Sequence, residues 1–306
     1  MVARLANNEP PRLGRLFICS PGWYYPARKI MRRDSVTEKK LILLTNDDGI
    51  RSPGLWAAAE ALAPVGFVTV VAPREQSTGA GRSMPASSEG RLYEEIVTVN
   101  GKSWKAYAAD GTPAQAVQHG LLEILPRLPD LVVSGINYGE NVGSGVTISG
   151  TVGAAFEGAS FGIPSLAVSL QTEPHYHQTH STDIDFSTAA FFAQKFARIL
   201  LGLTRPADVD ILKVEIPEGA TPQTPWRVTR LSRTRYFLPK KPVRENLGDK
   251  GRIGYTRRLE PDIVEPDSDV RALADGVVSV TPLSLDMTSR VDLKALASLL
   301  QRNGLE

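Results

Sequence analysis

The sequence has little cysteine, no long apolar run and no large excess of charge of either sign. Its 306 residues include a single cysteine, Cys19, which excludes an intrachain disulfide and any Cys-rich zinc or iron–sulfur site. No segment has the roughly 18 to 20 consecutive apolar residues that a membrane helix needs, and the apolar run 16–19 is too short for a signal peptide. We therefore expect a cytoplasmic protein that does not bind membranes.

The net charge of +2 is unevenly distributed. Residues 1–40 contain nine Lys/Arg and three Asp/Glu, whereas residues 41–306 contain 26 basic and 30 acidic side chains. The leader, residues 1–38, shows neither helical nor strand periodicity. This predicts a disordered basic tail or an over-called start, with Met31 as the alternative start. Because the rest of the chain is mildly acidic, nucleic acid is not an expected partner.

A second basic stretch, residues 227–258, has eleven Lys/Arg against two Asp/Glu, and it includes aromatic residues. Such charge would attract an anionic substrate or RNA. The aromatic residues do not form the regular ladder on which nucleic-acid bases stack. A solvated hairpin or a subunit-exchange arm is therefore the favoured prediction for this stretch.

Short apolar runs alternate with helical patterns, which is typical of parallel βα units. Ser52-Pro53 supplies an N-cap and a first-turn proline for a helix between two buried strands, and Asn100-Gly101 is a strong hairpin signal. The predicted strands are 41–44, 66–71, 91–99, 102–108, 130–134, 165–170, 211–216 and 276–281, and the predicted helices are 52–62, 112–125, 149–159, 186–203 and 291–300.

This pattern predicts an α/β fold with a doubly wound, mostly parallel sheet in a three-layer α/β/α sandwich. We expect a single domain over residues 39–306, with its core at residues 39–220. A hairpin insertion, an extension over residues 221–288 and a final helix over residues 289–303 complete it. In such sheets ligands bind beyond the carboxyl ends of the strands, so the loops at those ends should contain the site.

The first of these loops, residues 45–49, places two adjacent carboxylates after the first strand. Asp47 and Asp48 repel each other and lose hydration at a strand end, so a divalent cation is the expected partner. The motif is close to the haloacid-dehalogenase phosphatase signature, but the nucleophilic aspartate of that family is Asn46 here. Because an amide cannot form an aspartyl-phosphate, that mechanism is disfavoured. Asn46 is assigned to phosphate or substrate binding.

The second loop, residues 73–83, follows the second strand and contains Ser77 and Gly79. Its Gly79-x-Gly81 lacks the third glycine of a dinucleotide fingerprint. The Ser77 hydroxyl is instead a candidate metal ligand, and the flexible backbone at Gly79 lets N–H groups approach an anion.

The third loop contains Asn137 and Asn141 and continues into Ser149, Gly150 and Thr151 at the start of a helix. No P-loop lysine follows Gly150, which disfavours ATP-style phosphate binding. The free N–H groups and the positive end of the helix dipole at residues 149–151 suit a phosphate. Together the three loops offer hard oxygen ligands for Mg²⁺ or Mn²⁺ beside a phosphate cradle. This combination indicates metal-assisted phosphoester hydrolysis.

Several spaced motifs resemble those of the SurE (stationary-phase survival) family of 5′/3′-nucleotidases, namely residues 43–50, 134–137, 149–155, 164–170 and 279–283. The resemblance extends from about residue 40 to about residue 288. It implies a Rossmann-like core, a homodimer or homotetramer with a C-terminal exchange arm, and one divalent metal ion per subunit. The implied substrates are nucleoside 5′- or 3′-monophosphates, with short polyphosphate as a further one.

The resemblance also implies roles for the loop residues. Phosphate would be held by Asn141 and residues 149–151, and the metal by Asp47, Asp48, Ser77 and Asn137. Asp47 and Asp48 would be the catalytic residues, with Asp47 as acceptor of the proton of the attacking water. The amides of residues 149–151 would stabilise the developing charge.

Two segments depart from the pattern of that family. Gln115 and Ala116 stand where the family usually has Asp-Cys, and Lys213 and Glu215 stand where it usually has Asn-x-Asn. Neither segment contains a predicted metal ligand. We therefore expect these departures to affect pocket shape, substrate preference or the oligomer interface.

Two other functions are alternatives. His175, His177 and His180 have a spacing similar to the zinc motif of metallo-β-lactamase-like hydrolases, although the aspartate of that motif is a threonine here. A regulator with a degenerate site could bind nucleotides or RNA through the basic stretch, and it would show salt-dependent binding without phosphate release. The intact Asp47-Asp48 pair disfavours that regulator.

Overall fold

The computed structural model describes residues 39–258 and 263–303. The leader that the sequence predicts to be disordered, residues 1–38, lies outside the described residues. Among the residues that are described, no helix combines the length and the apolar composition needed to cross a membrane.

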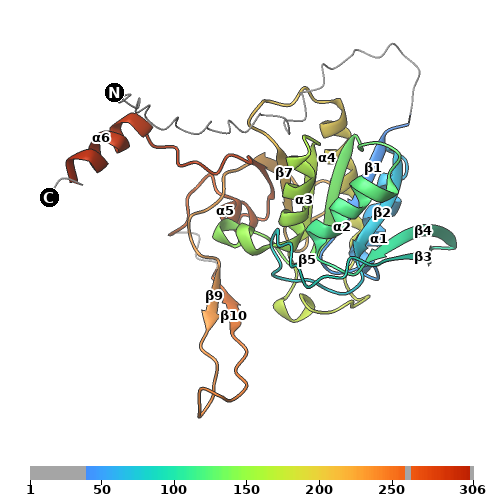
Figure 1. The fold of residues 1–306 in the computed structure, drawn as a ribbon, viewed down its shortest axis with the longest axis horizontal. Helices are drawn as coiled ribbons and strands as arrows, with labels where there is room; N and C mark the ends of the chain where they lie inside the picture. The colour runs from blue at the N-terminus through green and yellow to red at the C-terminus, as the bar shows by residue number, and fades with distance from the viewer. Residues whose placement is uncertain (1–38, 259–262, 304–306) are drawn as a thin grey trace, which may run out of the picture. The chain divides into compact units, whose positions relative to one another are not determined.

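In the described part of the chain the central sheet has nine strands, in the order β3-β4-β2-β1-β5-β6-β7-β11-β8 (Figure 1). The strands are β1 (Leu41–Thr45), β2 (Phe67–Pro73), β3 (Leu92–Val99), β4 (Lys102–Ala109), β5 (Leu131–Tyr138), β6 (Ser165–Leu170), β7 (Ile211–Ile216), β8 (Trp226–Val228) and β11 (Val278–Leu283). The run from β4 to β7 is parallel, whereas β3 and β11 are antiparallel to β4 and β7. The predicted doubly wound, mostly parallel sheet is confirmed.

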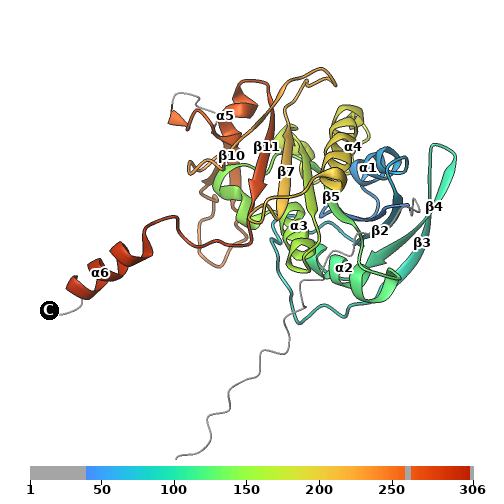
Figure 2. The same cartoon turned by 90° about the horizontal axis from the view of Figure 1, so that it is seen from above.

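Helices cover both faces of this sheet (Figure 2). The helical elements are α1 (Pro53–Leu62), α2 (Pro113–His119), η1 (Gly120–Ile124), η2 (Gly143–Ile148), α3 (Gly150–Ser160), η3 (Pro174–Tyr176), α4 (Ser187–Gly202), α5 (Asp269–Ala274) and α6 (Leu293–Asn303). α1 and α4 pack together on one face, and α2 and α3 pack together on the other. Within β1, Ile42 and Leu44 enter one apolar core while Leu41 and Leu43 enter the second. The fold is the predicted three-layer sandwich.

Local caps place the starts of the helices. Ser52 and Pro53 begin α1 as predicted, although the Ser52 side chain makes no capping hydrogen bond. At the start of α2 the Gln115 N–H donates to Thr112 Oγ1 at 3.2 Å, and the Thr112 N–H donates to Gln115 Oε1 at 3.0 Å. This reciprocal capping box gives Gln115, one of the two departures from the family pattern, a local structural role.

The structure extends the sheet beyond residue 220, which sequence analysis takes as the limit of the core. β11 pairs with β7, and β8 pairs with β11, so residues of the predicted extension form one edge of the main sheet. The helix predicted to reach residue 125 ends at His119 and continues as the π-helical turn η1. β8 and α5 are not predicted, because elements of three and six residues show too little periodicity.

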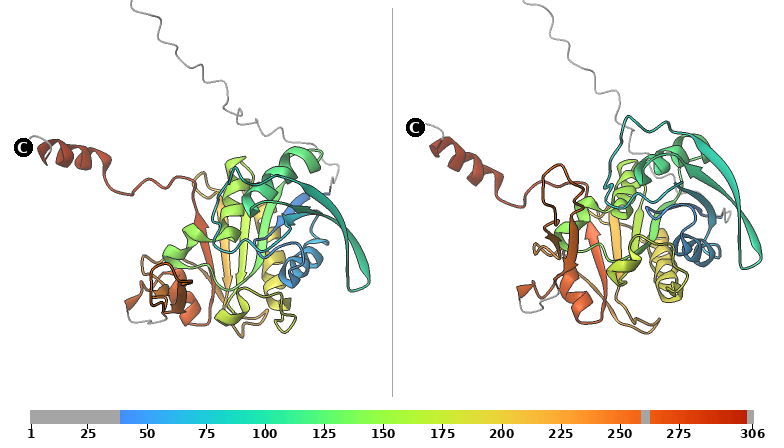
Figure 3. Two further views of the ribbon diagram at one scale, coloured as in Figure 1. Left: turned by 60° about the horizontal axis from the view of Figure 1, so that its bottom comes forward. Right: turned by 90° about the horizontal axis from the view of Figure 1, so that it is seen from below.

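Both expected hairpins form. The basic stretch folds into β9 (Phe237–Lys240) and β10 (Gly254–Arg257), which pair antiparallel outside the main sheet (Figure 1). The β3–β4 hairpin turns at Asn100 and Gly101, both with positive φ, and extends from one edge of the sheet (Figure 3).

Candidate functional site

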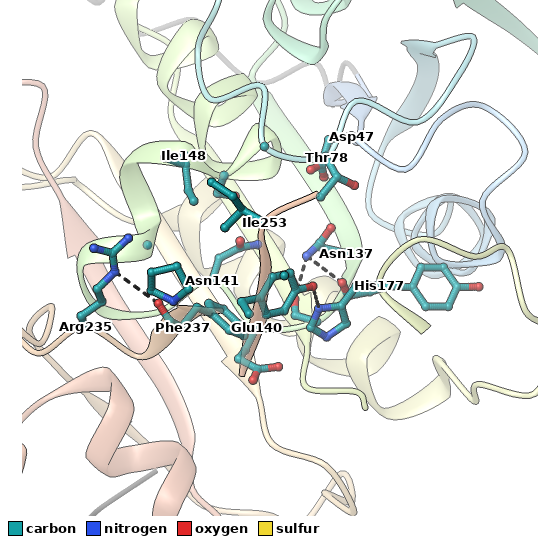
Figure 4. A pocket seen from close by; sticks show the side chains of 18 residues that line it. Asp47, Thr78, Asn137, Glu140, Asn141, Ile148, His177, Arg235, Phe237 and Ile253 are labelled. Atoms are coloured by element: carbon teal, nitrogen blue, oxygen red, sulfur yellow. Dashed lines mark hydrogen bonds between the residues drawn. The ribbon is translucent and has the colours of Figure 1, made fainter. Parts of the chain in front are cut away.

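The candidate site lies where the order of the parallel strands reverses. β1 has β2 on one side and β5 on the other, so the loops after β1 and β5 open into one crevice at the carboxyl ends of the strands. Asp47 and Asp48 follow β1, and Asn137 lies near the end of β5. Asp47 and Asn137 line the same pocket (Figure 4), which is the proximity that sequence analysis expects.

Asp47 and Asp48 are buried carboxylates, exposed to 3% and 1% respectively. The Thr151 hydroxyl donates to Asp47 Oδ1 at 2.5 Å. Asp48 accepts a hydrogen bond from Gln76 Nε2 at 3.1 Å and another from the Tyr138 N–H at 3.2 Å. All of these donors are neutral, so they do not compensate the buried negative charge.

The burial of this pair changes how readily its members ionise. Burial raises the pKa of Asp47 to about 6, although the hydrogen bond from Thr151 acts in the opposite direction. Burial, and secondly the negative charge of Asp47, raise the pKa of Asp48 well above its usual range. Two adjacent buried acids are costly when both are ionised, and a divalent cation between them would offset that cost.

The neighbouring oxygen atoms fit such a cation. Asn137 Nδ2 donates to Gly139 O at 2.7 Å and to Tyr138 O at 3.2 Å, and the amide oxygen faces the Asp47 side of the pocket (Figure 4). The Ser77 N–H donates to the Asp47 carbonyl at 2.7 Å, which holds Ser77 next to the acids. In residues 39–258 and 263–303 no three His, Cys, Asp or Glu side chains are grouped to hold a metal. A cation here would therefore need hydroxyl and amide oxygens as well as the two carboxylates.

The start of α3 lies against the acid pair. Ser149 caps the helix by accepting the Val152 N–H at 3.1 Å, and it lines the pocket. A Cβ on Gly150 would lie 2.6 Å from Asp47 Cβ, so only glycine permits this close approach. N–H groups in a first helical turn have no helical acceptor, and they bind anions readily.

The remaining predicted phosphate ligands differ in their availability. Asn46 donates to Gly49 O at 3.1 Å and accepts the Gly49 N–H at 3.2 Å, so its amide closes the turn that contains the acids. Asn141 lines the pocket, with Nδ2 donating to Ser169 Oγ at 3.0 Å. Gly79 also lines the pocket, and its φ of +79° requires the conformational freedom of glycine. The amide of Asn46 thus already has two backbone partners. Its assignment to phosphate binding stays a prediction.

The histidine cluster of the alternative zinc hydrolase is not grouped for metal binding in the described residues. His180 Nε2 donates to the Asp48 carbonyl at 2.7 Å. His177 Nδ1 accepts the Tyr255 hydroxyl at 2.9 Å, and its Nε2 donates to Thr172 O at 3.1 Å. These ring nitrogens face separate partners, so they do not converge on a common ion. His180 instead supports the loop of the acid pair, and His177 lines the pocket.

Part of the pocket is missed by sequence analysis. Phe237, Ile253 and Tyr255, all from the β9–β10 hairpin, form one wall. Gln76, which binds Asp48, is also missed. The only sign of this wall in the sequence was the presence of aromatic and apolar residues inside the basic stretch. Nothing in the sequence indicates that this stretch lies close to the loop after β1.

Comparison with known proteins identifies the family. The model of the family described as Survival protein SurE matches residues 42–237, which include the acid pair, Asn137 and the start of α3. The chain belongs to the SurE family.

Relatives in this family match the chain over nearly their whole length. A protein of Methanothrix thermoacetophila named 5′-nucleotidase SurE is 40% identical over 269 residues, covering 85% of this chain and 98% of that protein. A protein of Archaeoglobus fulgidus with the same name is 42% identical over 253 residues, covering 82% and 94%. The crystal structure of the SurE protein from Aquifex aeolicus superposes with a TM-score of 0.67 at 32% identity, covering 86% of this chain and 99% of that one. The family resemblance and the Rossmann-like fold are thereby confirmed.

Proposed function

We propose that this SurE family member is a divalent-metal-dependent phosphomonoesterase that hydrolyses nucleoside 5′- and/or 3′-monophosphates to nucleoside and phosphate. The main support is the buried Asp47-Asp48 pair beside the start of α3, because this arrangement would hold a cation and an anion side by side in one crevice. The 5′-nucleotidase names of the relatives agree with the prediction of an enzyme. A nucleotide-binding or RNA-binding regulator would not need two buried acids at this position.

The proposed metal ligands are Asp47, Asp48, Ser77 and Asn137. Their carboxylate, hydroxyl and amide oxygens suit Mg²⁺ or Mn²⁺. When bound, the ion would supply Lewis acidity to the phosphoryl group and to the attacking water.

The residues of the chain handle the proton and the developing charge. Asp47 lines the pocket and accepts the proton of the water as its oxygen attacks phosphorus. The P–O ester bond breaks, and the nucleoside oxygen leaves with the proton that Asp47 accepted from the water. The N–H groups at Gly150 and Thr151 bind the phosphoryl oxygens, and these contacts strengthen as negative charge builds up.

Phosphate release by chelator-treated protein tests this proposal. The substrates are 5′- and 3′-nucleoside monophosphates and short polyphosphate, each with and without added Mn²⁺ or Mg²⁺. We expect release only after an ion is restored. Equal release with and without metal would contradict the metal dependence. No release with any ion, together with salt-dependent RNA binding, would favour the regulator.

Replacing Gly150 with Ala tests the contact between α3 and Asp47. The new Cβ would lie 2.6 Å from Asp47 Cβ and 2.9 Å from Asp47 Oδ2, so Asp47 must move. Because displacing a catalytic group by about 1 Å can cost ~10²-fold in rate, we expect kcat/KM for a nucleoside 5′-monophosphate to fall about 10- to 100-fold. Gly202→Ala is the matched control, since its Cβ would have no atom within 4 Å. Equal activity of the two variants would contradict the role of this contact.

A further inference from the structure

The pocket has two ends of different chemistry (Figure 4). One end is polar and includes Asp47, Asn137 and Ser149. The other end includes the apolar and aromatic side chains of Ile148, Phe237 and Ile253, with the charged Arg235 beside Phe237 (Figure 4). Pro239 and Tyr255 also line the pocket. The volume of the pocket is about 250 Å³, close to the lower limit for small-ligand sites.

Two isoleucines at the apolar end are exposed to solvent. Ile148 is 63% exposed and Ile253 is 66% exposed. They come from separate parts of the chain, η2 and the segment before β10, yet both line this pocket. A ligand between them would remove apolar surface of both from water, so the position favours an apolar ligand group.

The aromatic rings at this end have fixed orientations. The Tyr255 hydroxyl donates to His177 Nδ1 at 2.9 Å, and His177 Nε2 donates to Thr172 O at 3.1 Å. Phe237 packs edge-on against the buried Tyr236, with ring centroids 4.8 Å apart and ring planes at 82°. Because contacts within the protein already orient these rings, a ligand would lose little affinity to ordering them.

The apolar end adjoins the proposed phosphate site. Ile148 directly precedes Ser149, the N-cap of α3. A ligand with its phosphate at the start of α3 would thus place the groups beyond its sugar toward the hairpin. Among Ile148, Phe237, Pro239, Ile253 and Tyr255, only Tyr255 has a polar side-chain atom, and that hydroxyl is already paired with His177. Two charged residues also line the pocket: Arg235, whose Nε donates to Phe237 O at 3.3 Å, and Glu140, which accepts the Tyr236 hydroxyl at 2.6 Å.

We propose that Ile148, Phe237, Ile253 and Tyr255 form the nucleobase site, an inference that rests on the proposed nucleotidase function. The base is bound by apolar contact and ring packing, with few hydrogen bonds to its edge. Larger purine rings therefore bind better than pyrimidines, while adenine and guanine are distinguished little. In the wild-type protein KM should be lower for AMP and GMP than for CMP and UMP, and the reverse order would contradict this site.

The variant Ile253→Ser, assayed with two substrates, tests the assignment. Ribose 5-phosphate has the phosphate and sugar of AMP without the base. We expect kcat/KM for AMP to fall about 10-fold, mainly through KM, because the loss of apolar contact in a pocket has an effect of this order. For ribose 5-phosphate the change should be less than about twofold. Val243→Ser is the matched control, since Val243 is on the same hairpin, 97% exposed and outside the lining of the pocket.

The outcomes separate this inference from the proposed function. An equal loss for AMP and ribose 5-phosphate, or no loss for either, would overturn the nucleobase site. If the wild-type protein releases phosphate from neither compound with any ion, the proposed function fails. In that case the affinities of AMP and ribose 5-phosphate for the wild type and for Ile253→Ser, measured by calorimetry, test the nucleobase site. Tighter binding of AMP that the variant loses would support it, and equal binding of the two compounds would overturn it.

Discussion

Replacing Asp48 with Asn is expected to lower metal-dependent phosphate release by about 10³-fold or more and to abolish the rise in Tm on adding Mn²⁺. The substitution keeps the size of the side chain but removes one of two buried negative charges. A Lewis acid supplies several kcal/mol of transition-state stabilisation, and ~4 kcal/mol corresponds to about 10³-fold in rate. Binding of the ion to the folded state alone raises Tm, so weaker binding removes that rise.

The metal-free variant gives a second readout. Burial and the neighbouring Asp47 charge raise the pKa of Asp48, so its ionised form destabilises the folded state. We expect the chelator-treated Asp48→Asn protein to be at least as stable as the wild type, which shows that any loss of activity is not unfolding. Asp183→Asn, at an exposed position, is the control. Full activity and an unchanged Tm response in Asp48→Asn would refute the proposed metal site.

Replacing Lys213 with Met is expected to lower the free energy of unfolding by about 3–5 kcal/mol, measured by urea denaturation. Lys213 is fully buried, and its Nζ lies 3.3 Å from Glu215 Oε1 and 3.1 Å from Asp269 Oδ2. Burial would lower the pKa of Lys213, but the two carboxylates raise it above its ordinary value. Removing the ammonium leaves both carboxylates buried without their cation, which is the costly case for a buried ion pair.

This charge cluster also supports the loop that lines the pocket. Glu215 accepts the Asn141 N–H at 2.9 Å, and Asp269 accepts the Gly143 N–H at 3.0 Å. The loss of stability in Lys213→Met should therefore be accompanied by a lower kcat/KM. Lys105→Met is the matched control, because Lys105 forms an ion pair with Glu94 at the surface. Such pairs contribute little to stability. Equal stability of the two lysine variants would show that the buried cluster is not needed for the fold.

The elements that position the acid pair could be predicted because their signals are local. The apolar run before Asp47 and the proline that begins α1 are visible in a few consecutive residues. The small residues of α3 are also visible in the sequence, although Gly150 and Gly153 pack against distant segments. The alternation of such signals was sufficient to predict the parallel sheet. In a doubly wound sheet the ligand-binding loops gather at the carboxyl ends of the parallel strands. This rule predicted that the loops after β1 and β5 would meet.

The structural role of only one of the two departures from the family pattern could be predicted. Gln115 forms a capping box within one turn of helix, and its spacing from Thr112 was a usable signal. In the sequence, Lys213 and Glu215 are visible only as charged residues within an otherwise apolar strand. The third member of their buried cluster is Asp269, in a short helix that showed no periodicity.

By itself the sequence determined the parallel strands of the sheet, the place of the Asp47-Asp48 pair after the first strand and the start of α3, because hydrophobic periodicity and helix caps depend on residues close in the chain. Only the tertiary structure decided that Lys213 pairs with Asp269 and that Ile148, Ile253 and Tyr255 line one pocket. These contacts join segments far apart in sequence. Their energies depend on burial and on interatomic distance, which no local pattern of residues specifies.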